Sequence, residues 1–291
     1  MILYDTKRKE GEALKRGMRN ELKEAKIIVV KMGTTSLTHD NGIINLRKLD
    51  QLARILTDLE NSGYRIVLVS SGAIGCGMHR LNMMSRPVTL EGKQVTAAVG
   101  QGLLMELYHR FFDSYHQNIG QILLTKDVFY HEIKRNNAKN TFCALLEREI
   151  IPVVNENDCI STDEIEEECF GDNDILSAMT ANLIGAQALI ILSDVEGLFN
   201  EDPSKNDNAV LIPLVKTVTS AIMKNGGSSG SGLGTGGMAT KLGAAKYATE
   251  HGINTVVASG DCVDNLYHIM DGEEIGTLFL RQNEKLGDGK C

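Results

Sequence analysis

A lysine behind a glycine-rich loop is the feature of this sequence best suited to handling a phosphate group. The stretch from Asn225 to Lys241, NGGSSGSGLGTGGMATK, leads into an expected helix over 238–251. A glycine-rich loop that feeds a helix N-terminus presents backbone N–H groups beside the positive end of the helix dipole, which suits phosphate. Lys241 lies one turn into that helix, so its ammonium could reach a phosphate that the loop holds.

The same loop has other interpretations. Gly232, Gly234 and Gly237 form G-x-G-x-x-G, but a dinucleotide fold needs that motif directly after its first strand, and no clear strand precedes it here. No segment matches the Walker A pattern. A flexible linker is disfavoured because the helix and strand downstream of the loop are too short for an independent domain. The phosphate role is therefore favoured, with a solvated Lys241 as the simpler alternative.

A second lysine stands where a buried strand is expected to end. The run KIIVVK at 26–31 is apolar and β-branched up to Lys31, and Gly33 follows. A lysine in that place is costly unless it is paired or used. The alternative is a side chain that extends to solvent at the sheet edge.

Acids and amides gather at two further junctions. Asp172, Asn173 and Asp174 open an expected helix over 174–185, and NEND at 155–158 ends an expected strand. Helix capping explains one of the three residues, but three in a row favour a further role. These groups could bind an ammonium or a carboxylate and balance lysines or Mg²⁺.

Other polar segments carry less information. The run TDEIEEECF at 162–170 is most simply a solvated acidic loop, and the acid and amide segments hold no histidine. Histidine-based acid–base or nucleophilic chemistry therefore has little support. Two lysines, a phosphate loop and a carboxylate and amide cluster fit phosphoryl transfer by positioning and charge stabilisation.

Alternating strands and helices must position these groups. Apolar runs predict strands, and 3.6-residue periodicity predicts helices between them. The expected strands cover 26–31, 64–72, 119–125, 150–158, 187–197, 253–260 and 275–280. The expected helices cover 46–63, 93–116, 135–148, 174–185, 238–251 and 262–271, with irregular hairpins before the glycine loop.

This alternation indicates an α/β protein with a mainly parallel sheet covered on both faces. Such sheets bind ligands at the carboxyl ends of their strands. Four of those ends carry polar or glycine-rich groups, namely Lys31–Thr34, Ser70–Gly72, Asn155–Asp158 and Ser193–Asp194. We therefore expect a ligand cleft at this edge.

Bulk composition bounds the class of protein. The chain has 291 residues, 42% of them hydrophobic and 23% charged, a balance typical of globular proteins. The net charge is −8, and glutamates dilute the basic N-terminal segment, which disfavours a nucleic-acid partner. There is no apolar signal core and no apolar run near the ~18 residues of a membrane span, so we expect a cytoplasmic protein without a membrane anchor.

The six cysteines are scattered without a C-x-x-C pair. This spacing disfavours a zinc site and a disulfide framework. We expect reduced thiols, since disulfides are rare in cytosolic proteins.

Eight segments together carry a family resemblance that spans residues 26–280. They are VVKMGTTSL, VSSGAIGCG, AAVGQGLLM, QILLTKDVF, IPVVNENDCI, GDNDILSA, LSDVEGLFNEDPS and SGLGTGGMATKLGAA. Their order is similar to that of the glutamate 5-kinase family, a branch of the amino-acid kinases. GLGTGGMATK and GDND distinguish it from acetylglutamate kinase, aspartokinase and uridylate kinase. The chain also resembles the kinase half of pyrroline-5-carboxylate synthase, without the reductase half.

The resemblance implies a three-layer αβα sandwich with a mainly parallel central sheet. It implies an N-terminal extension over 1–25, a kinase domain over 26–281 and a tail over 282–291. The N-terminal part of the kinase domain would bind glutamate and the C-terminal part ATP. The extension has no counterpart in the short bacterial pattern, and the C-terminal PUA domain of many bacterial members is missing.

The resemblance also implies a reaction. ATP would phosphorylate the γ-carboxylate of L-glutamate to L-glutamyl 5-phosphate, the first step of proline biosynthesis, with proline as feedback inhibitor. The cofactors would be ATP and Mg²⁺, with Mg²⁺ held mainly by ATP and water rather than by assigned protein ligands. A homodimer or homotetramer would be expected.

Carried over to this sequence, the family pattern implies roles for particular residues. Lys31 and Lys241 would flank the transferred phosphoryl group, and Asp174 would hold them in place. The residues implied for glutamate are Ser71, Asp158 and Asn173, with Asn155 and Asp172 close by. The residues implied for ATP are Lys31, Ser193, Asp194, Thr235, Gly236, Gly237, Met238, Ala239, Thr240 and Lys241.

Three other functions are compatible with parts of the pattern. One is a related carboxylate kinase such as acetylglutamate kinase. Another is a non-catalytic amino-acid or nucleotide sensor on the same fold, which would not need both lysines and Asp174. The third is an NAD-dependent oxidoreductase, for which only the G-x-G-x-x-G match speaks.

Overall fold

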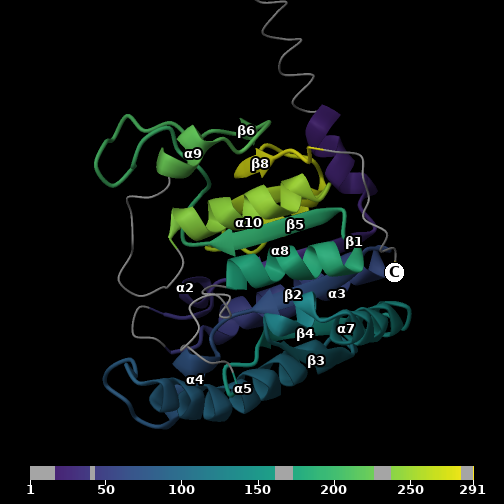
Figure 1. Ribbon diagram of the computed structural model, residues 1–291, viewed down its shortest axis with the longest axis vertical. Coiled ribbons are helices and arrows are strands. Elements are labelled where there is room, and N and C mark those ends of the chain that lie inside the picture. The colour runs from purple at the N-terminus through teal and green to yellow at the C-terminus, as the bar shows by residue number, and fades with distance from the viewer. Residues whose placement is uncertain (1–16, 40–42, 161–172, 226–236, 283–290) are drawn as a thin grey trace, which may run out of the picture.

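The computed structural model describes residues 17–39, 43–160, 173–225, 237–282 and 291. Its centre is an eight-stranded sheet in the order β3-β4-β2-β1-β5-β7-β8-β6 (Figure 1). All neighbouring strands run parallel except β7 and β8. The strands are β1 (Ile27–Met32), β2 (Arg65–Ser70), β3 (Ile119–Leu124), β4 (Ile151–Glu156), β5 (Ala188–Ser193), β6 (Leu214–Val215), β7 (Asn254–Ser259) and β8 (Thr277–Phe279). The predicted mainly parallel α/β sheet is confirmed.

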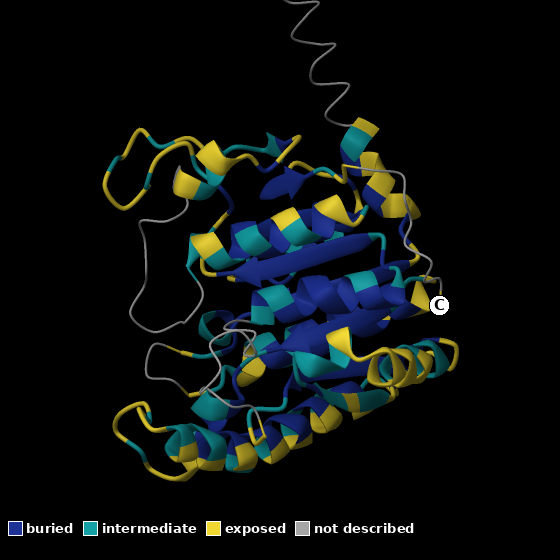
Figure 2. Ribbon diagram, in the orientation of Figure 1, coloured by how far each residue is buried: buried dark blue, intermediate teal, exposed yellow. Residues whose placement is uncertain are grey.

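Helices cover both faces of this sheet, whose strands are largely buried (Figure 2). A separate hydrophobic cluster fills the space between the helices and each face. The first face carries α3 (Leu46–Asn61), α4 (Ala73–Arg80), α5 (Leu90–Asp113) and α11 (Asn265–Met270). The second face carries α7 (Glu132–Leu146), α8 (Asn173–Ile184) and α10 (Met238–Glu250). The shorter helices are η1 (Glu21–Glu24), α2 (Thr34–Leu37), α6 (Asp127–Tyr130) and α9 (Ser220–Asn225). The predicted three-layer αβα sandwich is confirmed.

Alternation along β1 decides which face each side chain meets. Ile28 and Val30 lie in the cluster beneath α3 and α5, whereas Ile27 and Val29 lie in the cluster beneath α8 and α10. Since side chains alternate along a strand, Lys31 shares the face of Ile27 and Val29. Its ammonium is therefore directed towards α8 and α10 at the carboxyl end of the sheet.

Helix α4 was not predicted, because its glycines disfavour a helix between the expected strand over 64–72 and the expected helix over 93–116. One of them, Gly77, lies at a close helix contact. A Cβ atom on Gly77 would lie 1.9 Å from the carbonyl oxygen of Thr96, and one on Gly100 would lie 1.7 Å from that of Ala73. Helices α4 and α5 thus pack backbone against backbone. The predicted hairpin region is also mixed, because Phe199 and Leu211 form an antiparallel bridge but β6 pairs with β8 in parallel.

The expectation of reduced thiols throughout is wrong for one pair. Cys143 on α7 forms a disulfide with Cys291, and their Cα atoms lie 4.9 Å apart. The partners are 148 residues apart in sequence, so their spacing could not indicate a bridge that depends on tertiary proximity. The free thiols are Cys76, Cys159 and Cys262, while Cys169 lies outside the described residues. Burial raises the pKa of Cys76 to about 11, which keeps this thiol protonated.

Arg19 attaches the segment before β1 to the far edge of the sheet. The residue is 3% exposed, and its guanidinium donates to four backbone carbonyls at 2.8–3.0 Å. Burial lowers the pKa of Arg19, and the charge of Glu274 acts in the opposite direction. The four acceptors are the carbonyl oxygens of Pro213, Glu273, Ile275 and Gly276.

We expect Arg19→Ala to lower the free energy of unfolding by about 3 kcal/mol, because four carbonyls lose a charged donor. Urea unfolding measures the difference. Arg54→Ala is the control, since the Arg54 ion pair with Asp264 is half exposed at 3.4 Å and should contribute less than about 1 kcal/mol. Equal losses of unfolding free energy in the two variants would show that the hydrogen bonds of Arg19 to the four carbonyls do not stabilise the fold.

Candidate active site

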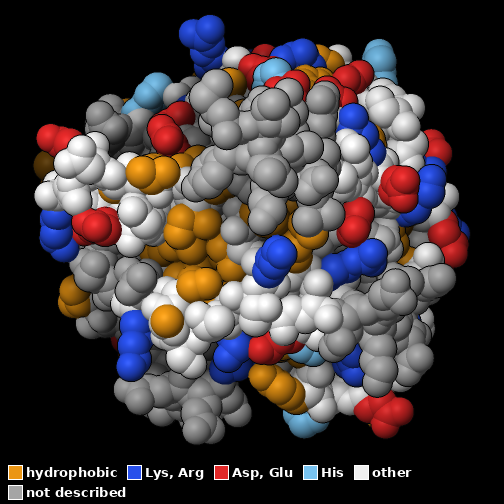
Figure 3. All heavy atoms as spheres, turned by 90° about the horizontal axis from the view of Figure 1, so that it is seen from above, with side chains coloured by type: hydrophobic (Ala, Val, Ile, Leu, Met, Phe, Trp, Pro, Cys, Tyr) orange, Lys and Arg blue, Asp and Glu red, His pale blue; other side chains and the backbone are white. Residues whose placement is uncertain are grey.

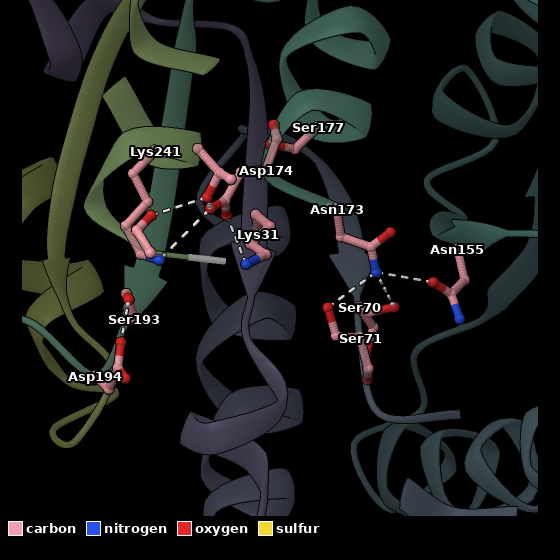
Figure 4. A network of polar contacts seen from close by, with 12 residues as sticks. Lys31, Ser70, Ser71, Asn155, Asn173, Asp174, Ser177, Ser193, Asp194 and Lys241 are labelled. Atoms are coloured by element: carbon pink, nitrogen blue, oxygen red, sulfur yellow. Dashed lines mark hydrogen bonds and ion pairs between the residues drawn. The ribbon is translucent and has the colours of Figure 1, made fainter. Parts of the chain in front are cut away.

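Two buried lysines meet one buried carboxylate at the carboxyl end of the sheet (Figure 4). The ammonium of Lys31 lies 2.6 Å from Oδ1 of Asp174, and that of Lys241 lies 3.5 Å from Oδ2. The three side chains are at most 5% exposed. These residues are distant from one another in the sequence, and the fold unites them.

Each member of this three-residue centre comes from a different element. Lys31 is the fifth residue of β1, Asp174 lies in the first turn of α8, and Lys241 lies in the first turn of α10. The two helices pack side by side over the face that Lys31 enters (Figure 1). The alternation of β1 and the adjacent starts of α8 and α10 therefore assemble the centre.

The carboxylate of Asp174 is held in its ionised form. Burial alone would raise its pKa, but the charges of Lys31 and Lys241 outweigh that cost. Hydrogen bonds from Lys31 and Thr240 act in the same direction, so the pKa of Asp174 lies below its usual value. One negative charge thus lies between two positive ones, so these three side chains together carry a net positive charge.

Residues of the glycine loop continue into the start of α10. Gly237 is its N-cap, with extended backbone, and no side chain of the described residues caps it. The first N–H groups of a helix have no partner within the helix. Met238 is half-buried and Ala239 exposed, while the hydroxyl of Thr240 donates to Asp174 at 3.1 Å. Thr235 and Gly236 lie outside the described residues.

Beside the lysine centre lies a network of amides and hydroxyls. Asn173 donates through Nδ2 to Oγ of Ser71 and to Oδ1 of Asn155, both at 2.9 Å, and to the carbonyl oxygen of Ser70 at 3.3 Å. Asn173 precedes Asp174 in the chain, so the start of α8 belongs to both groups (Figure 4). The structure thus brings together Ser71 and Asn155, from two of the predicted polar strand ends, and Asn173, from the start of a helix.

The network extends to two residues of α5 that sequence reasoning missed. Asn155 donates to Oε1 of Gln101 at 2.9 Å, and the hydroxyls of Ser70 and Tyr108 lie 2.6 Å apart. The sequence feature that could have indicated them is a polar group on a helix face that is otherwise apolar. A buried tyrosine hydroxyl usually has a hydrogen-bond partner. Tyr108 fits the apolar face of the helix, so its sequence position alone does not reveal the partner of its hydroxyl.

The remaining predicted residues lie at the same edge or outside the described residues. Ser193 ends β5 and donates to Oδ1 of Asp194 at 2.8 Å, with Asp194 itself exposed. Asp158 is half-buried in the turn after β4. Asp172 is one of the residues that the structure does not describe.

Within the part of the chain that the structure describes, no three His, Cys, Asp or Glu side chains gather as a metal site requires. Nor does any helix among those residues have the length and apolar character to cross a membrane. Acidic and basic side chains are interspersed over the described surface seen from above (Figure 3). The two ammonium groups beside Asp174 can bind an anion, and the adjacent amides offer donors and acceptors to a small polar molecule.

Comparisons with known proteins agree with this geometry. A model of the amino acid kinase family matches residues 26–259. The glutamate 5-kinase of Clostridium perfringens (strain 13 / Type A) is 48% identical over 264 residues, which cover 90% of this chain and 98% of that protein. The glutamate 5-kinase of Listeria monocytogenes serotype 4a (strain HCC23) is 44% identical over 270 residues, covering 92% and 98%.

Solved structures share the fold at low sequence identity. A carbamate kinase from Giardia lamblia bound to AMP-PNP has a TM-score of 0.63 at 16% identity, with 89% of this chain and 100% of that chain covered. The UMP kinase from Bacillus anthracis has a TM-score of 0.60 at 14% identity, with 89% and 97% covered.

Proposed function

The chain belongs to the amino acid kinase family, and on that premise we propose that it transfers the γ-phosphoryl group of ATP to the γ-carboxylate of L-glutamate. The products are ADP and L-glutamyl 5-phosphate. The observation that carries this proposal is the convergence of Lys31 and Lys241 on the buried Asp174. The glutamate 5-kinases that cover nearly the same length support the choice of acceptor.

The two lysines perform the electrostatic part of the reaction. A carboxylate and a triphosphate repel each other, and charge builds up on the transferred group in the transition state. Lys31 and Lys241 neutralise that charge, and Asp174 keeps both ammonium groups in place while ionised. Because these groups are buried, the attraction is screened less than it would be at the surface.

The amide and hydroxyl network holds the acceptor. The γ-carboxylate is already ionised near pH 7, so the attack on phosphorus requires no general base. Asn173, Ser71 and Asn155 orient the amino acid, and Asp158 supplies a carboxylate for its ammonium group, with Asp172, which directly precedes Asn173 in sequence, close by. Their work is binding and alignment, which converts a bimolecular encounter into a positioned reaction.

ATP fits the other side of the lysine centre. The start of α10 and the glycine loop, from Thr235 to Lys241, receive its phosphates, while Ser193 and Asp194 contact the nucleotide at the end of β5. Mg²⁺ bound mainly to the phosphates and water supplies further neutralisation of charge. Asp174 is already engaged by two lysines and Thr240, which agrees with a metal that takes few protein ligands.

We place this reaction in the cytoplasm, as the first step of proline biosynthesis, in a homodimer or homotetramer. Proline, which shares the α-carboxylate and amine of glutamate, acts as a feedback inhibitor in this proposal. Titration with proline at several glutamate concentrations measures its effect.

A hydroxamate assay tests the proposed reaction. Purified protein with MgATP, hydroxylamine and L-glutamate should give γ-glutamyl hydroxamate, because the acyl phosphate product is labile to nucleophiles. N-acetylglutamate in place of glutamate should give at most a few per cent of that rate, and omission of protein gives the background. A preference for N-acetylglutamate would replace this assignment with an acetylglutamate kinase. ATP or glutamate binding without hydroxamate would indicate a non-catalytic sensor.

A further inference from the structure

We propose that Tyr108 and Gln101 are positioning residues that set the affinity of the site for its amino-acid acceptor. Both belong to α5, and each bonds to a residue of the amide and hydroxyl network rather than to the lysine centre. The inference rests on the proposed function, since it concerns the acceptor side of the same reaction.

Tyr108 determines the position of the Ser70 and Ser71 backbone. It is fully buried, and its hydroxyl lies 2.6 Å from Oγ of Ser70. The hydroxyl of Ser70 also donates to the carbonyl oxygen of Ser71 at 3.0 Å, so the contact with Tyr108 connects α5 to both serines. Burial raises the pKa of Tyr108, which keeps its hydroxyl protonated.

Gln101 determines the orientation of the amides. It is 9% exposed, and its Oε1 accepts from Nδ2 of Asn155 at 2.9 Å. This leaves Oδ1 of Asn155 to accept from Asn173 at 2.9 Å and from the backbone N–H of Glu156 at 2.9 Å. The nitrogen of Asn173 is thereby turned to its three acceptors, and its carbonyl oxygen points away from them (Figure 4). That oxygen can accept a hydrogen bond from the ammonium group of an amino acid.

Helix α5 can impose these positions because it is held against the start of α4. Gln101 and Tyr108 are seven residues apart, two turns along the helix, and so lie on the same face. A Cβ atom on Gly100 would lie only 1.7 Å from the carbonyl oxygen of Ala73. Ala73 is two residues after Ser71, so this backbone contact connects α5 to the acceptor site directly.

The strand alternation places both contacts on the α5 face. Val153 lies in the cluster beneath α5, so Asn155 shares its face, and Ser70 likewise shares the face of Leu68. Around the two contacts the helix packs through apolar side chains such as Leu104 and Met105. A polar contact in such a setting orders its partners, because an unmatched group there is costly.

We expect Tyr108→Phe and Gln101→Met to raise the KM for glutamate about three- to tenfold. That is the change in affinity that the loss of one neutral hydrogen bond typically causes. The kcat and the KM for ATP should stay within about twofold. Each variant keeps the approximate side-chain volume, and the split between KM and kcat separates positioning from a general loss of folded protein.

Two matched controls remove similar bonds elsewhere. Tyr115→Phe removes a hydroxyl that donates to Asp50 at 2.9 Å, and Gln117→Met removes a buried amide that donates to Asn118 and Glu149. Neither side chain bonds to the amide and hydroxyl network, so both substitutions should leave the KM for glutamate unchanged.

The assay is run with glutamate, N-acetylglutamate and aspartate as acceptors. An unchanged KM for glutamate in Tyr108→Phe and Gln101→Met, with an active parent, overturns this inference and leaves the proposed function intact. A parent that prefers another of these acceptors overturns the proposed function, and the inference is then decided by the KM for that acceptor. A parent inactive with all three overturns both.

Discussion

We expect Lys31→Ala and Lys241→Ala each to lower kcat by about 10²- to 10³-fold, the usual effect of removing one group that stabilises transition-state charge. Both ammonium groups are buried against the carboxylate of Asp174. Removal of either one takes away a positive charge that offsets the repulsion between acceptor and ATP. Since the lysines lie outside the amide and hydroxyl network, the KM for glutamate should change by less than about threefold.

Steady-state hydroxamate or ADP-release assays at varied glutamate measure both constants. Lys246→Ala is the matched control, because Lys246 lies on the same helix, is half exposed and pairs only loosely with Glu250 at 3.9 Å. Its kcat should stay within about twofold of the parent value. Near-normal kcat in both Lys31→Ala and Lys241→Ala would contradict the catalytic assignment.

We expect Asp174→Asn to lower both the free energy of unfolding and the kcat. The amide keeps the shape of the side chain but removes the negative charge that two buried ammonium groups share. Loss of one member of a buried ion pair typically costs about 3–5 kcal/mol of the free energy of unfolding. The kcat should also fall, by at least about tenfold, because the lysines lose the charge that holds them in place.

Urea unfolding at pH 7 and activity assays on the folded protein measure these two effects. Asp261→Asn provides the comparison, since Asp261 pairs with Lys48 at 3.0 Å but its side chain is 80% exposed. That variant should lose less than about 1 kcal/mol. If Asp174→Asn were as stable and as active as Asp261→Asn, the negative charge of Asp174 would contribute neither to stability nor to catalysis.

The effect of Asp174 also has a pH signature. Its pKa is lower in the folded protein than in the unfolded chain, so its stabilisation is present above the unfolded value of about 4. That stabilisation is lost as the pH falls through the folded pKa. The stability difference between parent and Asp174→Asn should therefore be full at pH 7 and shrink in acid.

Much of the fold was predictable from local pattern. The apolar runs and helical periodicities located the seven expected strands and six expected helices to within a few residues. The parallel arrangement followed from their alternation. Helix α4 was missed because Gly75 and Gly77 lower helix propensity, and only its packing on α5 shows why glycine is needed at position 77.

The candidate site was predictable in its residue types but not in its contacts. The sequence predicted these residues because of their places in the elements. Lys31 ends an apolar strand, whereas Lys241 and the Asn173–Asp174 pair lie at the starts of helices. Their roles in binding and catalysis stay predictions until the variants are measured. Gln101 and Tyr108 were not chosen, since a buried helix face shows its polar partners only in three dimensions.

Local sequence patterns were enough to predict which strands and helices follow one another along the chain and that the strand ends are polar, because both depend on neighbouring residues. Three contacts became visible only in the folded molecule: those of Lys31 and Lys241 with one carboxylate, those of α5 with Ser70 and Asn155, and the disulfide of Cys143 with Cys291. These contacts join segments far apart in the chain. They depend on how the two helix layers pack on the sheet, which no local pattern encodes.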